Sequence, residues 1–181
     1  MKLTVEDFKK LGVQEKHIKP LIEEINKWFD VFNINTTNRL VDSLANILHE
    51  TALFRYSEEV GGSNSYDGGI LYKGRGIVQI THRYNYLAFQ EWLKKLGISV
   101  DLIKTPQLVS QRADLSVLSF CWFWEANNFS KLSDEGKFKE ICAIWNTGKA
   151  DRSVEKINGW KERNNYKVKV EAWLQDMING L

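Results

Sequence analysis

Apolar residues recur at helical spacing along most of the chain. In residues 38–50, NRLVDSLANILHE, the leucine, valine and isoleucine side chains fall on one face, which predicts an amphipathic helix that ends near Glu50. Thr4 followed by Asp7 predicts a helix start, and Gly12 predicts its end. Further helices are expected over about 20–30, 85–97, 134–145 and 160–177.

Residues 113–126, ADLSVLSFCWFWEA, are apolar nearly all round. A helix without a polar face is normally buried on every side, so this segment is predicted to be a central helix. The aromatic side chains Trp122 and Trp124 are expected to pack in the core, with sugar stacking as the alternative. Glu125, at the end of the same segment, is a weaker rival for a catalytic carboxylate, since nothing around it indicates a cleft.

The segment ILYKGRGIVQIT differs from the helical pattern. It predicts two short strands, at about 70–72 and 77–80, joined by a Gly-Arg-Gly turn. Gly74 and Gly76 allow the backbone to approach a neighbour closely, and neither phosphate-binding glycine motif is present. Gln79 and Thr81 alternate with apolar residues, so one face of the predicted hairpin is polar.

Length and charge limit the possible classes of protein. With 181 residues and 43 % hydrophobic content, the chain is long enough for one well-buried domain, residues 1–181. A net charge of +2 with interspersed signs gives no reason to expect nucleic acid, although a slightly basic surface would be drawn to an anionic cell wall. We expect a monomer.

No membrane span, metal or cofactor is expected. No apolar window approaches the roughly 18 residues of a span, and the N-terminus lacks a signal-peptide core, which predicts a cytoplasmic location in the producing cell. Cys121 and Cys142 lie in apolar segments and are expected to be small buried side chains. The three histidines form no metal motif.

Residues 49–81 gather ionisable, aromatic and glycine residues that a packing core does not require. If the helix continued past Glu50, Glu59 would lie on the opposite face, about 13.5 Å further along the axis. The glycines and serines after Leu53 instead predict a loop that folds Glu59 back toward Glu50. Two carboxyls across a cleft can hydrolyse a glycoside with inversion. On residue type alone, the favoured interpretation is that Glu58 and Glu59 are a solvated charge pair and Glu50 a helix-surface residue.

The order of motifs narrows these alternatives. HET..FRYSEE followed by YKGRGIVQITHRYNY, then ICAIWNTG and INGWKERNNY, resembles the chitinases and phage endolysins of glycoside hydrolase family 19. The resemblance covers about residues 34–170, and residues 1–33 are assigned to helical packing. It implies an α+β, predominantly α-helical, lysozyme-like single domain with a small β-hairpin beside the active-site cleft. Ala52 and Leu53 stand where the family often has two glycines, and Thr147 stands where another is usual.

Carried over position by position, the resemblance implies that Glu50 is the general acid and Glu59 the general base, with Thr81 holding the attacking water. Supporting roles are expected for Arg163, which would brace the carboxylates, for Arg75, and for His49 as a structural hydrogen-bonding group. The residues implied to line the sugar subsites are Tyr72, Gln79, Asn85, Tyr86 and Asn146.

The resulting expectation is an endolysin that cleaves β-1,4 bonds of peptidoglycan by an inverting, metal-free mechanism and reaches the wall after holin-type release. That choice of substrate rests on the resemblance together with the missing signal peptide. The first alternative is a chitinase acting on chitin oligomers. The second is a non-catalytic protein that binds cell wall or chitin on the same scaffold.

Overall fold

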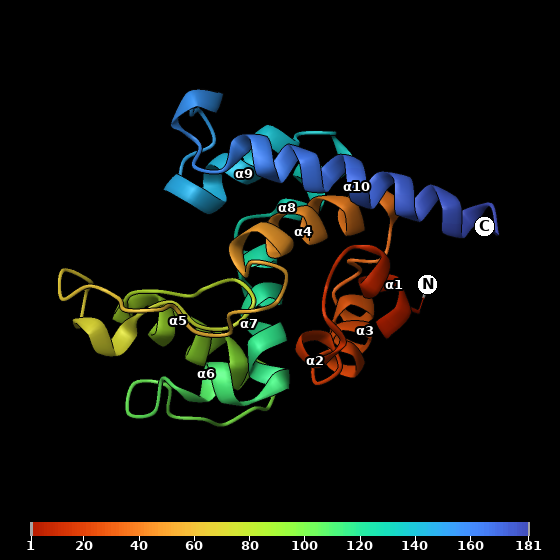
Figure 1. Ribbon diagram of the computed structural model, residues 1–181. Helices are drawn as coiled ribbons and strands as arrows, with labels where there is room; N and C mark the ends of the chain where they lie inside the picture. Colours follow the sequence, from red (N-terminus) through yellow and green to blue (C-terminus); the bar gives the residue numbers. More distant parts are fainter. Residues whose placement is uncertain (1, 181) are drawn as a thin grey trace.

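The computed structural model describes residues 2–180, and helices dominate this part of the chain (Figure 1). The elements are α1 (Val5–Lys10), α2 (Glu15–Ile18), α3 (Ile22–Val31), α4 (Thr37–Glu50), η1 (Ile70–Tyr72), α5 (Arg83–Lys95), α6 (Leu108–Gln111), α7 (Ala113–Ala126), α8 (Phe129–Asp134), α9 (Phe138–Thr147), η2 (Val154–Lys156) and α10 (Trp160–Ile178).

Helix α7 is the centre of the molecule, as its all-round apolar sequence predicts. Helices α3, α5, α6 and α8 all contact it, and Leu115 to Cys121 are buried without interruption. The N-terminal helices join the same core through Phe8, Ile25 and Phe29. Such burial on all sides removes a large apolar area from water, which is the main favourable contribution to folding.

Helices α4 and α10 pack along each other above α7 (Figure 1). Helix α4 begins at Thr36, whose side chain accepts a hydrogen bond from the Arg39 N–H, and it ends at Glu50 as predicted. Helix α10 begins after Gly159, which has a φ of 68°. A side chain at Gly159 would overlap the ring of His49 from α4, so the start of α10 rests directly on that ring.

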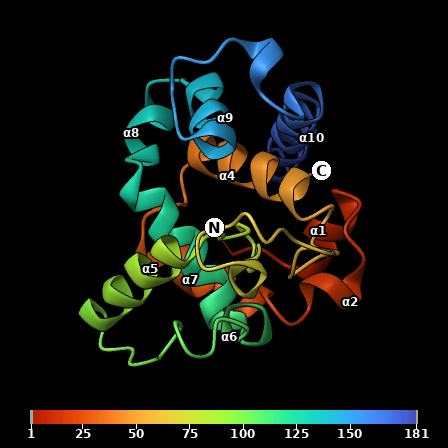
Figure 2. The same cartoon turned by 90° about the vertical axis from the view of Figure 1, so that its left-hand side faces the viewer.

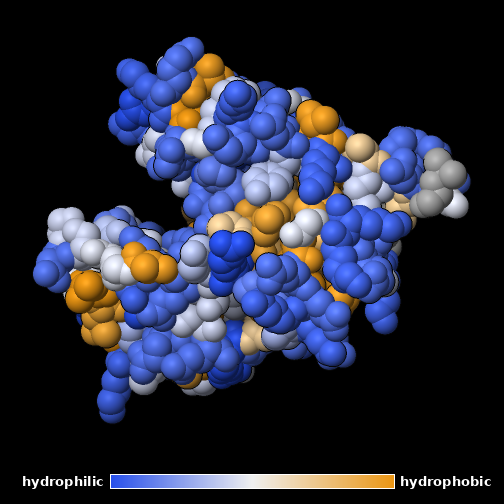
Figure 3. Space-filling model, viewed as in Figure 1, coloured by the Kyte–Doolittle hydropathy of each residue, from blue (hydrophilic) through white to orange (hydrophobic). Residues whose placement is uncertain are grey.

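A groove opens on the side of the molecule opposite the two termini. The space-filling view shows it as a hollow between the α9 end of the upper helices and the segment around α5 below (Figure 3). Figure 2 views the molecule from that side, with α4 between α9 and α7. Glu50 ends α4 beside this groove, and the 55–82 segment forms its other wall.

The chain reverses immediately after α4. Ala52, Leu53 and Phe54 have φ values of 48°, 64° and 59°, three consecutive left-handed residues that are not glycine. The Thr51 hydroxyl holds this turn, because it donates to the Ile47 carbonyl at 2.7 Å and accepts from the Phe54 N–H at 2.8 Å. The predicted loop that brings Glu59 back toward α4 is therefore present.

The predicted β-hairpin is wrong. Residues 70–72 form the 3-10 turn η1, and among residues 2–180 the only bridges are Glu58 with Arg75 and Arg75 with Ile80. Ile77, Val78 and Ile80 are buried, and the Ile77 N–H donates to the Ser116 carbonyl of α7. Burial without strand pairing therefore produced the alternation that a strand would also produce.

The helix expected over 134–145 is α9, and it begins later than predicted. Gly136 has a φ of 69° and separates α8 from α9, which starts at Phe138. Helix α9 ends at the NTG sequence, where Gly148 caps it in the left-handed conformation. Within residues 2–180, no helical segment has the length and the hydropathy that a bilayer-spanning helix requires.

Replacing Ala52 by Gly is expected to raise the free energy of unfolding by about 1 kcal/mol, because glycine adopts a positive φ without the steric cost that alanine has. Ala52 is exposed, so no packing is lost. Replacing the exposed Ala172 inside α10 by Gly should lower the free energy of unfolding by about 1 kcal/mol. Urea unfolding of both variants checks the opposite signs, and a loss at both positions would contradict the turn geometry.

Replacing Gly159 by Ala should cost about 1–3 kcal/mol more than replacing Gly136 by Ala. The two glycines share nearly the same φ, 68° and 69°, but a side chain at Gly136 meets nothing within 4 Å. The difference between the two variants in urea unfolding isolates the contact with His49. Equal costs would mean that the ring does not support the start of α10.

Candidate active site

Two adjoining pockets form the floor of the groove. The first has a volume of about 320 Å³ and the second about 530 Å³. They share five lining residues and are therefore parts of one continuous groove: Val78, Gln79, Thr81, Trp145 and Asn146. A groove of this length fits an extended ligand better than a compact one.

Glu50 lines the first pocket from the end of α4. Its Oε1 accepts a hydrogen bond from Arg163 of α10, whose side chain is 1 % exposed while that of Glu50 is 23 % exposed. Arg163 also donates to the Asn46 side chain and to the Asn158 carbonyl. These contacts fix the guanidinium, and the guanidinium in turn fixes the carboxyl at the edge of the groove.

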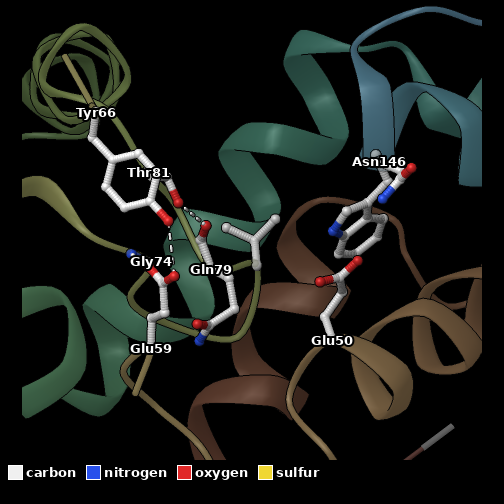
Figure 4. Close-up of a pocket in the computed structure, with 9 residues that line it drawn as sticks. Glu50, Glu59, Tyr66, Gly74, Gln79, Thr81 and Asn146 are labelled. Carbon is white, nitrogen blue, oxygen red and sulfur yellow. Dashed lines mark hydrogen bonds between the residues drawn. The ribbon is translucent and has the colours of Figure 1, made fainter. Parts of the chain in front are cut away.

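Glu59 lines the same pocket from the opposite wall (Figure 4). The Tyr66 hydroxyl donates to Oε1 at 2.8 Å, and the Gly74 N–H donates to Oε2 at 3.0 Å. Both bonds use the carboxylate as an acceptor, which is the only role that an ionised carboxylate has. The bond to Glu59 raises the pKa of Tyr66, so the phenol keeps the proton that it donates.

A second network holds the segment that carries Glu59. Glu58 pairs with Lys73 at 2.7 Å and with Arg75 at 2.9 Å, and it accepts from the Ser110 hydroxyl at 3.0 Å. Arg75 is 5 % exposed and also donates to the Tyr86 hydroxyl at 3.0 Å. The two neighbouring glutamates therefore have different roles. Glu58 forms ion pairs that hold the loop, whereas Glu59 faces the groove.

Gln79 and Thr81 lie between the two carboxyls along the floor (Figure 4). Gln79 has a φ of 57° and donates from its side chain to the Gly76 carbonyl at 2.9 Å. The Thr81 hydroxyl donates to the Gln79 carbonyl at 2.9 Å. The hydroxyl proton is thus used, whereas the hydroxyl oxygen accepts no hydrogen bond from residues 2–180.

Asn146 and Asn85 are placed on the groove as the resemblance implies, in different parts of it. Asn146 lines both pockets and accepts from the Asn158 N–H at 3.1 Å. Asn85 lines the second pocket only, and its amide donates to the Thr81 carbonyl. Trp122 also lines the second pocket, so its ring is open to a ligand.

The prediction that Tyr72 and Tyr86 line the sugar subsites is wrong. Tyr86 is 0 % exposed and Tyr72 is 5 % exposed, and neither lines the groove pockets. Their rings pack edge to face at 5.5 Å, and their hydroxyls donate to the carbonyls of Lys73 and Ile103. Buried on all sides, they have no surface to offer a sugar and instead hold the loop from beneath.

The remaining aromatic and acidic candidates lie away from the carboxyl pair. Trp124 is 2 % exposed and belongs to the core, as expected. Glu125 accepts from the Trp92 indole N–H at 2.6 Å and does not line either groove pocket. His49 does not line them either. Burial lowers its pKa and the Arg163 cation lowers it further, which suits a neutral ring packed under α10.

Two aromatic residues that line the first pocket were not predicted from the sequence. Tyr66 stands alone in a loop of glycine, serine and asparagine, and an isolated aromatic residue in such a loop was the available signal. Trp145 lines both pockets, and its indole N–H is buried without a partner among residues 2–180. Within the same residues, no three His, Cys, Asp or Glu side chains converge as a metal site would require.

The Glu58 network predicts a pH dependence of stability. Partial burial raises the pKa of Glu58, but the hydrogen bonds from Lys73, Arg75 and Ser110 outweigh it and hold the pKa below the ordinary 4.5. A carboxyl with a lowered pKa stabilises the fold fully above its unfolded pKa, and this contribution is lost as pH falls through the folded pKa.

We therefore expect Glu58→Gln to lower the free energy of unfolding at pH 7, and the gap from the parent to shrink in acid as the pH drops below about 4.5. Urea unfolding at a series of pH values measures this gap. A gap that stays constant across the acid range would show that the charge of Glu58 contributes nothing.

Comparison with known proteins places this geometry in a family. A protein of Haemophilus influenzae described as a glycosyl hydrolase family 19 domain-containing protein is 34 % identical over 83 residues, 45 % of this chain and 38 % of that protein. An endochitinase of Pisum sativum is 36 % identical over 93 residues, 51 % of this chain and 26 % of that protein. The chain thus spans well under half the length of these relatives.

Two solved structures resemble this chain over a greater share of its length than the sequence relatives do. Chitinase C of Streptomyces griseus superposes with a TM-score of 0.72 over 95 % of this chain and 92 % of that chain, at 18 % identity. A class IV chitinase of Zea mays superposes with a TM-score of 0.59 over 96 % of this chain and 80 % of that chain, at 21 % identity. These matches confirm the predominantly helical, lysozyme-like fold class.

A family model described as chitinase class I, of glycoside hydrolase family 19, matches residues 55–168. The match includes Glu59, Gln79, Thr81 and Arg163, whereas Glu50 precedes it. Because it covers more than half of the chain, this chain belongs to glycoside hydrolase family 19.

Proposed function

We propose that this protein hydrolyses β-1,4 bonds between N-acetylated amino sugars, with inversion. The observation that carries the proposal is the placement of Glu50 and Glu59 on opposite walls of one pocket, from separate elements of the fold. Inverting glycosidases need such a pair, one carboxyl to protonate the leaving oxygen and one to activate water on the other face of the sugar.

Glu50 is proposed as the general acid. Arg163 contacts its Oε1, and no donor among residues 2–180 contacts Oε2, which is the oxygen available to carry the proton. Once the proton passes to the glycosidic oxygen, a carboxylate remains beside the guanidinium. The Arg163 guanidinium is already in place and stabilises the negative charge that develops on Glu50.

Glu59 is proposed as the general base. Tyr66 and Gly74 orient the carboxylate, and the Thr81 hydroxyl has lone pairs free to accept a hydrogen bond from water. A water held between Glu59 and Thr81 would attack the anomeric carbon from the face opposite Glu50. The proton lost by the water would go to Glu59, while Glu50 would supply one to the leaving group.

Chitin is the first candidate substrate. The endochitinases and chitinases among the relatives, and the description of the family model, support it. The length of the groove fits a polysaccharide, and Trp122 and Trp145 offer apolar rings beside the amides of Gln79 and Asn146. Aromatic and amide groups side by side suit a sugar with an acetamido group.

Peptidoglycan is the second candidate, in the role of an endolysin that reaches the wall after holin-type release from the cytoplasm of a producing cell. Its amino-sugar backbone presents the same bond type to the two carboxyls. The net charge of +2 favours association with an anionic wall. Incubation with chitin oligomers and with purified peptidoglycan, followed by mass analysis of the new reducing ends, separates the two substrates and identifies the bond cut.

A non-catalytic binding protein is the third alternative, and the carboxyl pair argues against it. A binder has no use for two acidic groups held at opposite walls of a groove by separate networks. Such a protein would release no reducing ends from either polymer, even with the parent sequence.

Glu50→Gln and Glu59→Gln should each lower kcat on chitin oligomers by about 10²–10⁴-fold, because each removes a proton-transfer group and keeps the size of the side chain. The matched control is Glu125→Gln, a carboxyl outside the groove, which should keep nearly full activity. Retention of more than a tenth of the activity in either groove variant, with the fold intact by circular dichroism, would overturn the assignment.

A further inference from the structure

A third pocket lies apart from the groove and shares no lining residue with its two parts. Its volume is about 270 Å³, and it lies where α2, the start of α7 and residues 54–57 meet. Three basic side chains line it: Lys16 and His17 from α2, and Arg55 from the turn after α4. No aspartate or glutamate lines it, although the chain as a whole has nearly equal numbers of both signs.

The three basic groups lack counter-charges. Among residues 2–180, none of the ion pairs or side-chain hydrogen bonds involves Lys16, His17 or Arg55. Burial lowers the pKa of His17, and Lys16 and Arg55 lower it further, with no carboxylate acting in the opposite sense. The pocket therefore has two cationic side chains and a histidine on its wall and no acidic side chain, so its charge favours an anion.

Hydroxyl groups complete the wall. Ser116 of α7 lines the pocket and is 2 % exposed, and its hydroxyl has no hydrogen-bond partner among residues 2–180. Leaving a buried hydroxyl without a hydrogen-bond partner is unfavourable, so such groups usually serve a ligand or an ordered water. Ser57 contributes a second hydroxyl at the rim.

The start of α7 adds to the positive potential. Ala113, its first residue, lines the pocket, and the N-cap residue Arg112 makes no side-chain hydrogen bond to the first turn. The first turn of a helix of 14 residues presents the positive end of the helix dipole. Charge, hydroxyl donors and the helix end therefore converge on one cavity.

We propose that this pocket binds a phosphate group. An arginine fork, a lysine, a histidine and two hydroxyls supply more donors than the two oxygens of a carboxylate can accept, whereas a phosphate has enough oxygens for them and carries up to two charges. The volume exceeds that of one phosphate, so the group can be a free ion or the ester of a larger molecule, such as a phosphorylated sugar.

The pocket touches the base of the segment that carries Glu59 without entering the groove. The Ser57 carbonyl accepts from the Gly76 N–H at 2.9 Å, and the Ser110 hydroxyl, also at this pocket, donates to Glu58 at 3.0 Å. Because no groove residue lines the pocket, phosphate binding can be measured independently of hydrolysis.

The test is a titration of the full chain with inorganic phosphate and, separately, with glycerol 3-phosphate, at constant ionic strength set by sodium chloride. The ring resonances of His17 should shift saturably, and the pKa of His17 should rise when the anion binds. Tighter binding of glycerol 3-phosphate would indicate an esterified ligand, and equal or tighter binding of inorganic phosphate would indicate the free ion.

Arg55→Gln and Ser116→Ala should each weaken binding about tenfold or more, as expected for loss of a hydrogen bond to a charged group. Lys104→Gln is the control, because it removes one exposed positive charge away from the pocket. No saturable shift of His17, or an equal loss in Lys104→Gln and Arg55→Gln, would overturn the proposal.

Discussion

The buried guanidinium of Arg163 is the constraint on which the groove depends. A charge that is 1 % exposed must be fully paired, because leaving it without partners would cost several kcal/mol. Its three partners are Asn46 and Glu50 on α4 and the Asn158 carbonyl before α10. Satisfying Arg163 therefore docks α10 on α4 and, in the same act, sets the carboxyl of Glu50 at the edge of the groove.

The opposite wall of the groove is also held by a buried and paired arginine, Arg75. Arg75 is 5 % exposed, and its partners Glu58, Tyr86 and the Leu71 carbonyl tie the loop after α4 to its own base. Glu59 is then held by Tyr66 and Gly74 on a segment that has no regular strand. Each wall of the groove is thus held by a buried arginine. Each arginine donates hydrogen bonds to backbone and side-chain acceptors that would otherwise be left unpaired.

Helical periodicity was sufficient to locate the helices, because the apolar stripe and the capping residues of a helix can both be read from one continuous stretch of sequence. The end of α4 at Glu50 and the central position of α7 follow from such local patterns. The loop from 52 to 82 was harder to predict. The alternation of apolar and polar residues in 77–80 reflects burial of the apolar side chains rather than strand pairing. A motif names Tyr72 and Tyr86 but does not give their orientation, and both face the core. Tyr66 carried only a weak signal, because its bond to Glu59 depends on how the loop folds.

The central claim is that water attacks on the Glu59 side while Glu50 protonates the opposite face of the same bond. The most direct measurement is proton NMR of the first products released from a chitin oligomer, recorded before the anomers equilibrate. The geometry predicts that the new reducing end appears as the α-anomer, by inversion of the β bond. Initial release of the β-anomer would mean that a carboxylate or the substrate's acetamido oxygen attacks before water, and would contradict the role assigned to Glu59.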